Sequence, residues 1–349
     1  MRTKLYYHPV MKEHLTGENH PERPERIDAA LSAVHEFSQI QIVESGPCTE
    51  EDVLAVHPPE YLEKLRSEIP AEGVVMASSG DVMLSPKTLE AAFHASGAIC
   101  RAIDDVMLGI TDNAYVLQRP GGHHAERETA KGFCIFAHAV VGARYAKNHY
   151  PDEIKKIAIV DFDIHGGNGT DDCVRGSPDE EDFMLVSSHQ AYTEHGAYQG
   201  LYPMGFGNPR YDREHPTIIN IPLPAGTKSH AFRAAYEDKV FPRLREFAPD
   251  LILVEAGYDG DARELFDVTK GKKFLLAPDD FYWLGSELRD IAREHSKGRI
   301  VMVMAGGYNL QVLADGTRAS LAVLQDMPMP KQKLLPESLR SPPVRDLGY

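Results

Sequence analysis

The residues whose types and spacing first point to chemistry are Asp161, Asp163 and His165. They end an apolar run, residues 156–160, that is typical of a buried strand. Alternate residues of a strand share one face, so the two carboxylates and the imidazole point into the same space. A divalent cation would relieve their mutual repulsion and their loss of hydration. The alternative is a solvated strand end whose acids accept hydrogen bonds.

Polar or titratable groups beside small residues follow four other predicted strands. The carboxyl ends of parallel strands meet at one crevice, where open α/β sheets bind their ligands. Five such coincidences at five strand ends favour a functional site over unrelated turns. The four further segments are 119–126, 187–189, 256–261 and 305–309.

In this crevice, Asp163, His165 and Asp259 would give a metal site with two oxygen ligands and one nitrogen ligand. Three protein ligands leave positions for water and substrate, which is typical of a catalytic metal rather than a structural one. A cation held there lowers the pKa of bound water and polarises a carbonyl. Taken alone, Asp259 has an ordinary interpretation as a cap or turn residue.

Three further side chains suit the hydrolysis of an amide or an ester. His123 and His124 supply imidazoles that could take a proton from water and hand it to a leaving amine. Tyr308, which follows a Gly-Gly pair, could donate a hydrogen bond to an oxyanion. Considered alone, two adjacent histidines in a loop are usually solvated, and a Gly-Gly-Tyr-Asn sequence is an ordinary turn. The prediction of hydrolysis therefore depends on these residues occurring together with the predicted metal ligands.

The elements that must position these residues are continuous apolar strands separated by helices. This alternation predicts an α/β fold with three layers, α/β/α, around a central, mostly parallel sheet covered on both faces. No composition shift divides the chain, so residues 1–349 are predicted to form a single domain with an irregular tail from about residue 327. Predicted strands cover 114–117, 157–163, 183–187, 217–221, 251–255 and 299–304. Predicted helices include 27–37, 132–149, 229–247, 279–295 and 310–324.

Local signals mark several boundaries in the first third of the chain. Thr49 and Asp52 fit a capping box that opens a short helix. Ser85 resembles an N-cap with Pro86 at the first helical position, opening a helix that runs to about Leu108. Residues 66–84 are expected to form a surface loop. This loop and residues 196–216 could cap the crevice or mediate assembly into a homo-oligomer, and the residues do not choose between these roles.

Composition excludes several classes of protein. The formal net charge of −15 argues against nucleic acid as a partner, because phosphates would be repelled. No apolar run approaches the ~18 residues that span a membrane. The four cysteines are scattered without a CxxC motif, so neither a disulfide framework nor a cysteine zinc site is indicated. With no signal peptide at the N-terminus, a cytoplasmic location is expected.

At this point the chain resembles the histone deacetylase and acetylpolyamine amidohydrolase superfamily, which has the arginase–deacetylase fold. The resemblance runs in the family's order from about residue 14 to 325 and is closest to the class II type and its bacterial relatives. It rests on a set of segments rather than on any one motif. These are 20–26 (HPERPER), 56–61 (VHPPEY), 119–126 (RPGGHHAE), 132–134 (GFC), 161–170 (DFDIHGGNGT), 257–259 (GYD) and 306–309 (GGYN).

The resemblance implies a zinc ion held by Asp163, His165 and Asp259. It also implies His124 as general base and then acid, His123 as an electrostatic partner oriented by Asp161, and Asn168 as the residue that orients His124. Tyr308 would polarise the scissile carbonyl, and Phe133 would line a tunnel for an acyl-lysine. A structural potassium ion is expected near Asp161, with Ser187, Asp163 and His165 contributing.

Three departures from the family pattern bear on these expectations. The family usually has a second histidine where this chain has Gly166, so local packing must differ. Residues 260–266 lack the usual Asp-Pro, which leaves substrate specificity open. Asp261 creates an Asp-x-Asp pattern similar to that of arginase, but a binuclear manganese site would also need an acid at Gly167. One catalytic metal is therefore favoured.

The leading hypothesis is a zinc-dependent amidohydrolase, a deacetylase acting on N-acetylated amines such as acetyl-lysine or acetylpolyamines. Its ligand set also accepts Fe²⁺ or Co²⁺, and availability often decides. One alternative is an arginase-like binuclear manganese ureohydrolase. The other is a catalytically silent binding protein of the same fold.

Overall fold

The computed structural model describes residues 1–340 except 195–196, 201, 204–205, 209–214 and 265–272. Its centre is one sheet, in which every strand pair is parallel except β7 with β8. The strand order is β2 (Gln41–Glu44), β1 (Thr3–Tyr7), β5 (Asn113–Val116), β11 (Ile300–Met304), β10 (Leu251–Ala256), β6 (Ile157–Asp161), β7 (Phe183–Glu194) and β8 (Ala197–Gly200), and β9 (Ile218–Leu223) also pairs with β7.

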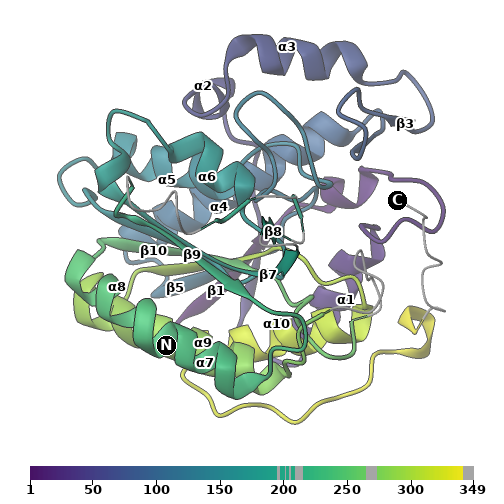
Figure 1. Ribbon diagram of the computed structural model, residues 1–349. Coiled ribbons are helices and arrows are strands. Elements are labelled where there is room, and N and C mark those ends of the chain that lie inside the picture. The colour runs from purple at the N-terminus through teal and green to yellow at the C-terminus, as the bar shows by residue number, and fades with distance from the viewer. Residues whose placement is uncertain (195–196, 201, 204–205, 209–214, 265–272, 341–349) are drawn as a thin grey trace.

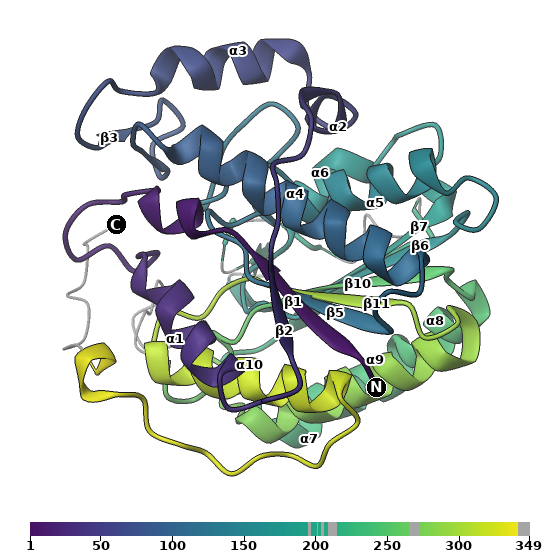
Figure 2. The same ribbon diagram turned by 180° about the vertical axis from the view of Figure 1, so that it is seen from behind.

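Helices cover both faces of this sheet (Figures 1 and 2). The predicted three-layer α/β/α architecture with a mostly parallel sheet is therefore confirmed. On one face lie α4 (Thr88–Met107), α5 (His138–His149) and α6 (Asn168–Val174), with α2 (Glu50–Leu54) and α3 (Pro59–Glu68) farther from the sheet on the same side. The other carries α1 (Glu25–Val34), α7 (Ser229–Lys239), α8 (Phe241–Phe247), α9 (Pro278–His295) and α10 (Leu310–Leu324).

The central strands are apolar throughout because both of their faces are buried. Every residue of β6, β10 and β11 is buried. In β10, Ile252 and Val254 pack into the core beside α9 and α10, whereas Leu251 and Leu253 pack into the core beside α4 and α5. This alternation by twos within a continuous apolar run is what a parallel strand between two helical layers requires.

Two predicted helices differ from the structure at their ends. The helix expected over 132–149 begins only at His138, because Gly132 (φ 53°) and Phe133 (φ 66°) adopt left-handed backbone conformations that no right-handed helix contains. The helix expected over 229–247 is divided into α7 and α8 at Val240. Pro242, at the start of α8, has no amide hydrogen to continue the helical hydrogen bonds of α7.

In the first third of the chain, the structure confirms one predicted feature and corrects two. Thr49 and Asp52 form the predicted capping box. The helix expected to open at Ser85 begins at Thr88, with Lys87 as N-cap. The expected loop at 66–84 contains a short hairpin, β3 (Val75–Met76) with β4 (Met83–Leu84).

The remaining described elements are three 3-10 turns. They are η1 (Pro9–Glu13), η2 (Glu180–Asp182) and η4 (Glu337–Leu339). All four cysteines lie in the described part of the chain and are buried and free. Among the residues described, no helix is both long and apolar enough to cross a bilayer.

Candidate metal centre and active site

The centre of the site is the turn that follows β6. The amide of Asp163 donates to Asp161 Oδ1 (3.0 Å), and the amide of His165 donates to Asp163 Oδ1 (2.9 Å). Asp259 Oδ1 accepts the amide of Ile164 (3.0 Å) from the loop after the neighbouring strand β10. Two strand ends are thereby joined through side chains that sequence analysis had singled out.

Asp163, His165 and Asp259 form one compact cluster of metal-ligating atoms. One donor atom from each lies within 4.8 Å of the others, and all three residues are buried. Nδ1 of His165 is 2.9 Å from Asp163 Oδ1 and 3.1 Å from Asp259 Oδ2. Asp259 Oδ2 accepts no hydrogen bond of good geometry, which leaves a buried lone pair available to a cation. Two carboxylates and one imidazole are a donor set that would hold a divalent metal.

The charges in this cluster show what a cation would do there. Burial and the nearby Asp163 carboxylate raise the pKa of Asp259 to about 6. Burial lowers the pKa of His165, but the Asp163 and Asp259 carboxylates outweigh it and raise the value to about 10. A proton on His165 and a divalent cation therefore compete for the same negative charge.

Two glycines form the wall behind Asp163. A Cβ at Gly257 would lie 2.2 Å from Asp163 Oδ2, and a Cβ at Gly306 would lie 2.2 Å from the same oxygen and 2.3 Å from Asp259 Oδ2. The amide of Gly306 instead donates to Asp163 Oδ2 (2.8 Å). Any side chain at either position would displace a candidate ligand, so the close backbone approach requires glycine.

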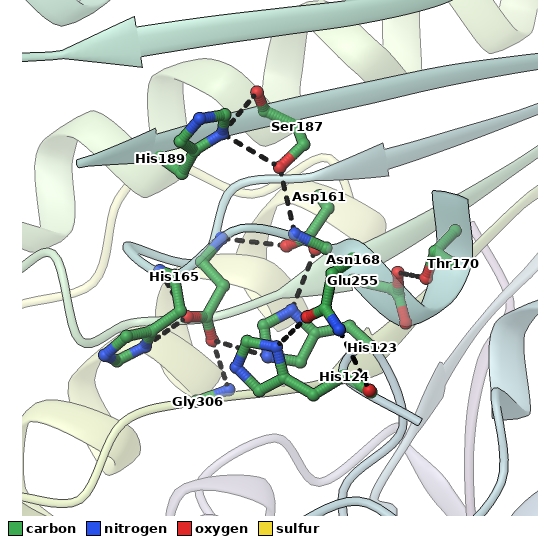
Figure 3. Close-up of polar contacts among 12 residues, drawn as sticks. His123, His124, Asp161, His165, Asn168, Thr170, Ser187, His189, Glu255 and Gly306 are labelled. Atoms are coloured by element: carbon green, nitrogen blue, oxygen red, sulfur yellow. Dashed lines mark hydrogen bonds and ion pairs between the residues drawn. The ribbon is translucent and has the colours of Figure 1, made fainter. Parts of the chain in front are cut away.

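His123 and His124 sit beside the cluster with different partners (Figure 3). His123 Nδ1 lies 2.9 Å from Asp161 Oδ2, and His124 Nδ1 lies 2.7 Å from Asn168 Oδ1. Burial lowers the pKa of His123, but the Asp161 and Asp163 carboxylates raise it to about 10. Burial and the charges of His123 and His165 hold the pKa of His124 well below its usual range. The pair therefore combines a cationic and a neutral imidazole.

Tyr308 and Phe133 border the same space. Tyr308 follows β11 through Gly306 and Gly307, and φ of Gly307 is 114°. The Phe133 and Tyr308 rings meet edge to face with centroids 6.0 Å apart. The guanidinium of Arg26 lies 5.0 Å from the centroid of the Tyr308 ring. Burial holds the pKa of Tyr308 well above its usual range, so its hydroxyl keeps its proton.

The comparisons with known proteins agree with this arrangement. The family profile "Histone deacetylase domain" matches residues 20–324. The chain belongs to the histone deacetylase family. It is 35% identical over 329 residues to "Histone deacetylase 10, chloroplastic" of Oryza sativa subsp. japonica, covering 87% of this chain and 70% of that protein. It is 32% identical over 292 residues to "Histone deacetylase-like amidohydrolase" of Pseudomonas aeruginosa, and this match covers 83% of this chain and 72% of that protein.

A solved structure matches the fold over nearly the whole chain. The structure titled "Crystal Structure of HDA15 HD domain" superimposes with a TM-score of 0.79 at 24% identity, and the match covers 95% of this chain and 91% of that one. At this level of identity the match shows the fold. It supports the topology described above independently of the motifs.

The departure from the family pattern at Gly166 has a steric explanation. A Cβ at Gly166 would lie 2.1 Å from Cδ1 of Phe206. The Phe206 ring lies against His189, with centroids 5.4 Å apart, so it occupies the space that a larger residue 166 would need. The local packing therefore differs as expected, because the Phe206 ring lies directly against Gly166.

Asp261, the residue behind the arginase-like pattern, is occupied elsewhere. Its carboxylate accepts three hydrogen bonds from Arg263. The donors are the backbone amide (2.8 Å), Nε (2.9 Å) and a terminal guanidinium nitrogen (2.8 Å) of that arginine. It is not part of the metal-ligand cluster found among the described residues. Residues 265–266, at the end of the unusual 260–266 segment, lie outside the described residues.

Ser187 and Asp161 meet at a small cavity beside the metal cluster. They are paired across β6 and β7, and Ser187 Oγ accepts the amide of Gly167 (3.1 Å). The cavity has a volume of about 10 Å³, and its lining includes Asp161, Gly167, Thr170 and Ser187. This is room for an occupant of about the size of one water molecule.

Three sets of polar contacts in the site region were not anticipated from the sequence. The hydroxyl of Tyr202 donates to Asp81, while its ring packs edge-on against His124 (centroids 4.8 Å). The Glu255 carboxylate accepts the Thr170 hydroxyl (2.7 Å), and burial with the nearby Asp161 charge raises its pKa to about 8. Glu264 binds the turn that carries Tyr308. Of these, only Glu255 carried a signal, as a charged residue inside an apolar strand.

Proposed function

We propose that this protein is a zinc-dependent deacetylase that hydrolyses N-acetyl or N-acyl amides. The observation that carries the proposal is the position of the His123–Asp161 and His124–Asn168 pairs beside the Asp163, His165 and Asp259 cluster. The membership of the chain in the histone deacetylase family supports it. So do the names of its relatives, which include deacetylases and an amidohydrolase.

Asp163, His165 and Asp259 would hold the zinc ion. When bound, zinc supplies a Lewis acid that polarises the scissile carbonyl and lowers the pKa of a water molecule. The same oxygen and nitrogen donors accept Fe²⁺ or Co²⁺, so the metal loaded in the cell depends on supply as well as on the site.

The two histidines would divide the proton transfers between them. The Nδ1 hydrogen of His124 points at Asn168 Oδ1, which leaves Nε2 as a lone pair able to accept a proton. His124 would take the proton of the attacking water and later pass it to the leaving amine. His123, kept cationic by Asp161, would stabilise the negative charge that develops in between.

Tyr308 and Phe133 would act on the substrate itself. The protonated Tyr308 hydroxyl would donate a hydrogen bond to the carbonyl oxygen as that oxygen gains charge. Phe133 would present an apolar wall to the alkyl part of the acyl-amine. Acetyl-lysine in a protein, acetylpolyamines and other acylated small molecules all remain candidate substrates, because each carries this amide on an alkyl chain.

Asp161 and Ser187 would hold a structural potassium ion in the adjoining cavity. Support comes from the cavity itself, which is lined by both residues, and from its size. We further propose that residues 1–349 act as one catalytic domain in the cytoplasm, on an acetylated amine rather than on nucleic acid. A homo-oligomeric state stays a prediction.

The test is acetate release from a panel of acetyl-lysine peptides, acetylpolyamines and acylated metabolites, on metal-stripped protein before and after zinc addition. Zinc-restored turnover of one class is the expected result. Tyr308→Phe and His124→Ala should each lower kcat by about 100-fold or more. The matched controls are Tyr282→Phe, whose hydroxyl donates to the carbonyl of Met327, and His149→Ala, at the exposed last residue of α5. Full activity in both site variants would rule out this mechanism, and urea release with two manganese ions per chain would favour the arginase-like alternative.

A further inference from the structure

Glu264 is buried and binds the turn that carries Tyr308. Its Oε2 accepts the amide of Tyr308 (2.9 Å) and its Oε1 accepts the amide of Asn309 (2.9 Å). Glu264 is 1% exposed. We propose that Glu264 is a positioning residue that fixes the Tyr308 hydroxyl relative to the metal ligands. The inference rests on the proposed function, in which Tyr308 binds the substrate carbonyl.

The Tyr308 turn needs an external support because its own sequence gives it little stiffness. It starts with Gly306 and Gly307, which lack a Cβ and so restrict the backbone least. It ends where α10 begins, and there the Asn309 side chain caps Gln311 and Val312 rather than residue 308. The amides of Tyr308 and Asn309 point away from the helix and into the carboxylate of Glu264. One buried charge thus satisfies two consecutive donors of the turn.

Residues 261–264, the described part of the segment that carries Glu264, are held in place by several hydrogen bonds. Arg263 binds Asp261 through its amide and its guanidinium, and donates to Asp315 of α10 (2.7 Å). The amide of Glu264 donates to the carbonyl of Asp261 (3.0 Å), which closes a tight turn. The side-chain amide of Asn309 donates to the carbonyl of Arg263 (2.9 Å). These contacts fix the backbone from Asp261 to Glu264 relative to α10 and to the Tyr308 turn.

This segment also contains a metal ligand. Glu264 follows Asp259 by five residues, and the amide of Asp261 donates to the carbonyl of Tyr258, which keeps the turn after Asp259 closed. A single short stretch of chain therefore holds a metal-ligating carboxylate at one end and the support of Tyr308 at the other. A shift of Tyr308 by about 1 Å is enough to cost up to about 100-fold in rate, so such a link has a measurable consequence.

A second side chain, that of Arg26, also supports this turn. Arg26 Nε donates to the carbonyl of Gly307 (2.9 Å), and another guanidinium nitrogen donates to the carbonyl of Ala305. Arg26 therefore engages carbonyls, while Glu264 engages amides. Removing Glu264 would free residues 308–309 without releasing the rest of the turn, which is the pattern expected of a residue that positions one side chain.

The test compares Glu264→Gln with the parent enzyme and repeats the substitution in a Tyr308→Phe background. Glutamine keeps the shape but offers one carbonyl oxygen instead of two acceptors. We expect kcat to fall about 10- to 100-fold with little change in KM or zinc content. In the Tyr308→Phe background, the same substitution should change kcat by less than about twofold, because its effect is already lost.

Two further arms keep the result interpretable. Glu68→Gln is the matched control, since Glu68 also accepts a backbone amide, that of Ser78, but far from Tyr308. Hydrogen–deuterium exchange of a peptide covering 305–312 should increase in Glu264→Gln and not in the control. If Glu264→Gln does not fold, Glu264→Asp, which keeps the charge but shortens the reach, takes its place in every arm.

Each outcome decides between the claims. An equal loss of kcat with and without the Tyr308 hydroxyl would show that Glu264 does not act through Tyr308. Unchanged kcat and unchanged exchange would likewise overturn the inference while leaving the proposed function intact. Absence of turnover in the parent enzyme with zinc bound would overturn the proposed function, and with it the role of Glu264 in turnover.

Discussion

His124 donates through Nδ1 to the neutral amide oxygen of Asn168, at 2.7 Å, whereas the adjacent His123 faces the carboxylate of Asp161 at 2.9 Å. The centroids of the two rings lie only 3.8 Å apart, so these partners decide which imidazole carries the positive charge. A charged partner stabilises the cation of His123, and a neutral partner leaves His124 as the base.

Replacing Asn168 with aspartate would test this division. Asn168→Asp places a negative charge beside His124, which should raise the pKa of His124 and move the acid limb of kcat/KM to higher pH by about one unit or more. A pH–rate profile measures the shift. Asn148→Asp adds the same charge at an exposed position of α5 and should leave the profile in place. An unmoved limb in Asn168→Asp would mean that His124 is not the base.

The metal ligands predict a defined stoichiometry. Asp259→Asn should lower zinc affinity more than about 10-fold, since even residues that only hydrogen-bond to a ligand contribute that much. Asp261→Asn, two residues along the chain, should keep one zinc per chain because Asp261 binds Arg263. Elemental analysis after dialysis against buffers of graded free zinc concentration measures both the zinc affinity of Asp259→Asn and the zinc content per chain of Asp261→Asn. Loss of a second metal ion on Asp261→Asn would instead support a binuclear site.

The packing at Gly166 predicts a steric penalty. Gly166→Ala should lower the free energy of unfolding by about 1–3 kcal/mol, because the new methyl group overlaps the ring of Phe206. Phe206→Leu should recover part of that loss when combined with Gly166→Ala. Urea unfolding of the parent, the two single variants and the double variant gives a double-mutant cycle. Strict additivity of the two effects would show that Phe206 is not the obstacle.

The cavity beside Asp161 predicts a response to potassium. Potassium chloride should raise the melting temperature above its value in tetramethylammonium chloride at the same ionic strength, and Ser187→Ala should reduce that difference. Ser188→Ala is the control, because the hydroxyl of Ser188 binds Tyr236 instead. If Ser187→Ala leaves this difference in melting temperature unchanged, potassium binds elsewhere and not beside Ser187.

Buried histidines predict a loss of stability in acid. Burial lowers the pKa of His57 to about 4, and the ring binds the carbonyl of Arg127 and the amide of Ala137. The unfolded chain binds the proton first, so stability present above pH 6.5 is lost as pH falls toward 4, by about 3 kcal/mol for this group. His57→Gln should flatten the dependence of unfolding free energy on pH by that amount, and the exposed His149→Gln should not. Equal slopes in all three proteins would contradict the assignment.

The sequence predicted the parts of the site that depend on regular structure. Parallel strands bring Asp161, Asp259 and Tyr308, which lie at or just after three strand ends, to the same edge of the sheet. Asp163 and His165 lie in the turn after β6, because this strand ends at Asp161 and not at the predicted residue 163. It failed where distant contacts decide the backbone. The left-handed residues Gly132 and Phe133 shorten the predicted helix, and no local pattern signals them.

Hydrogen bonds between residues far apart in the chain also could not be predicted from the sequence. The hydrogen bond from Tyr202 to Asp81 joins residues 121 positions apart. Glu264 binds backbone amides, which every residue except proline has, so no residue type at 308 or 309 could mark them as its partners.

Gly257 and Gly306 have a consequence for the thermodynamics of metal binding. Because their backbone closes off the space behind Asp163, the carboxylate loses its rotational freedom when the chain folds, before any ion arrives. Binding a cation then orders little that is not already ordered, so its entropy should be dominated by the water and protons released. The site is organised in advance, and its affinity reflects the chemistry of the donors rather than the cost of assembling them.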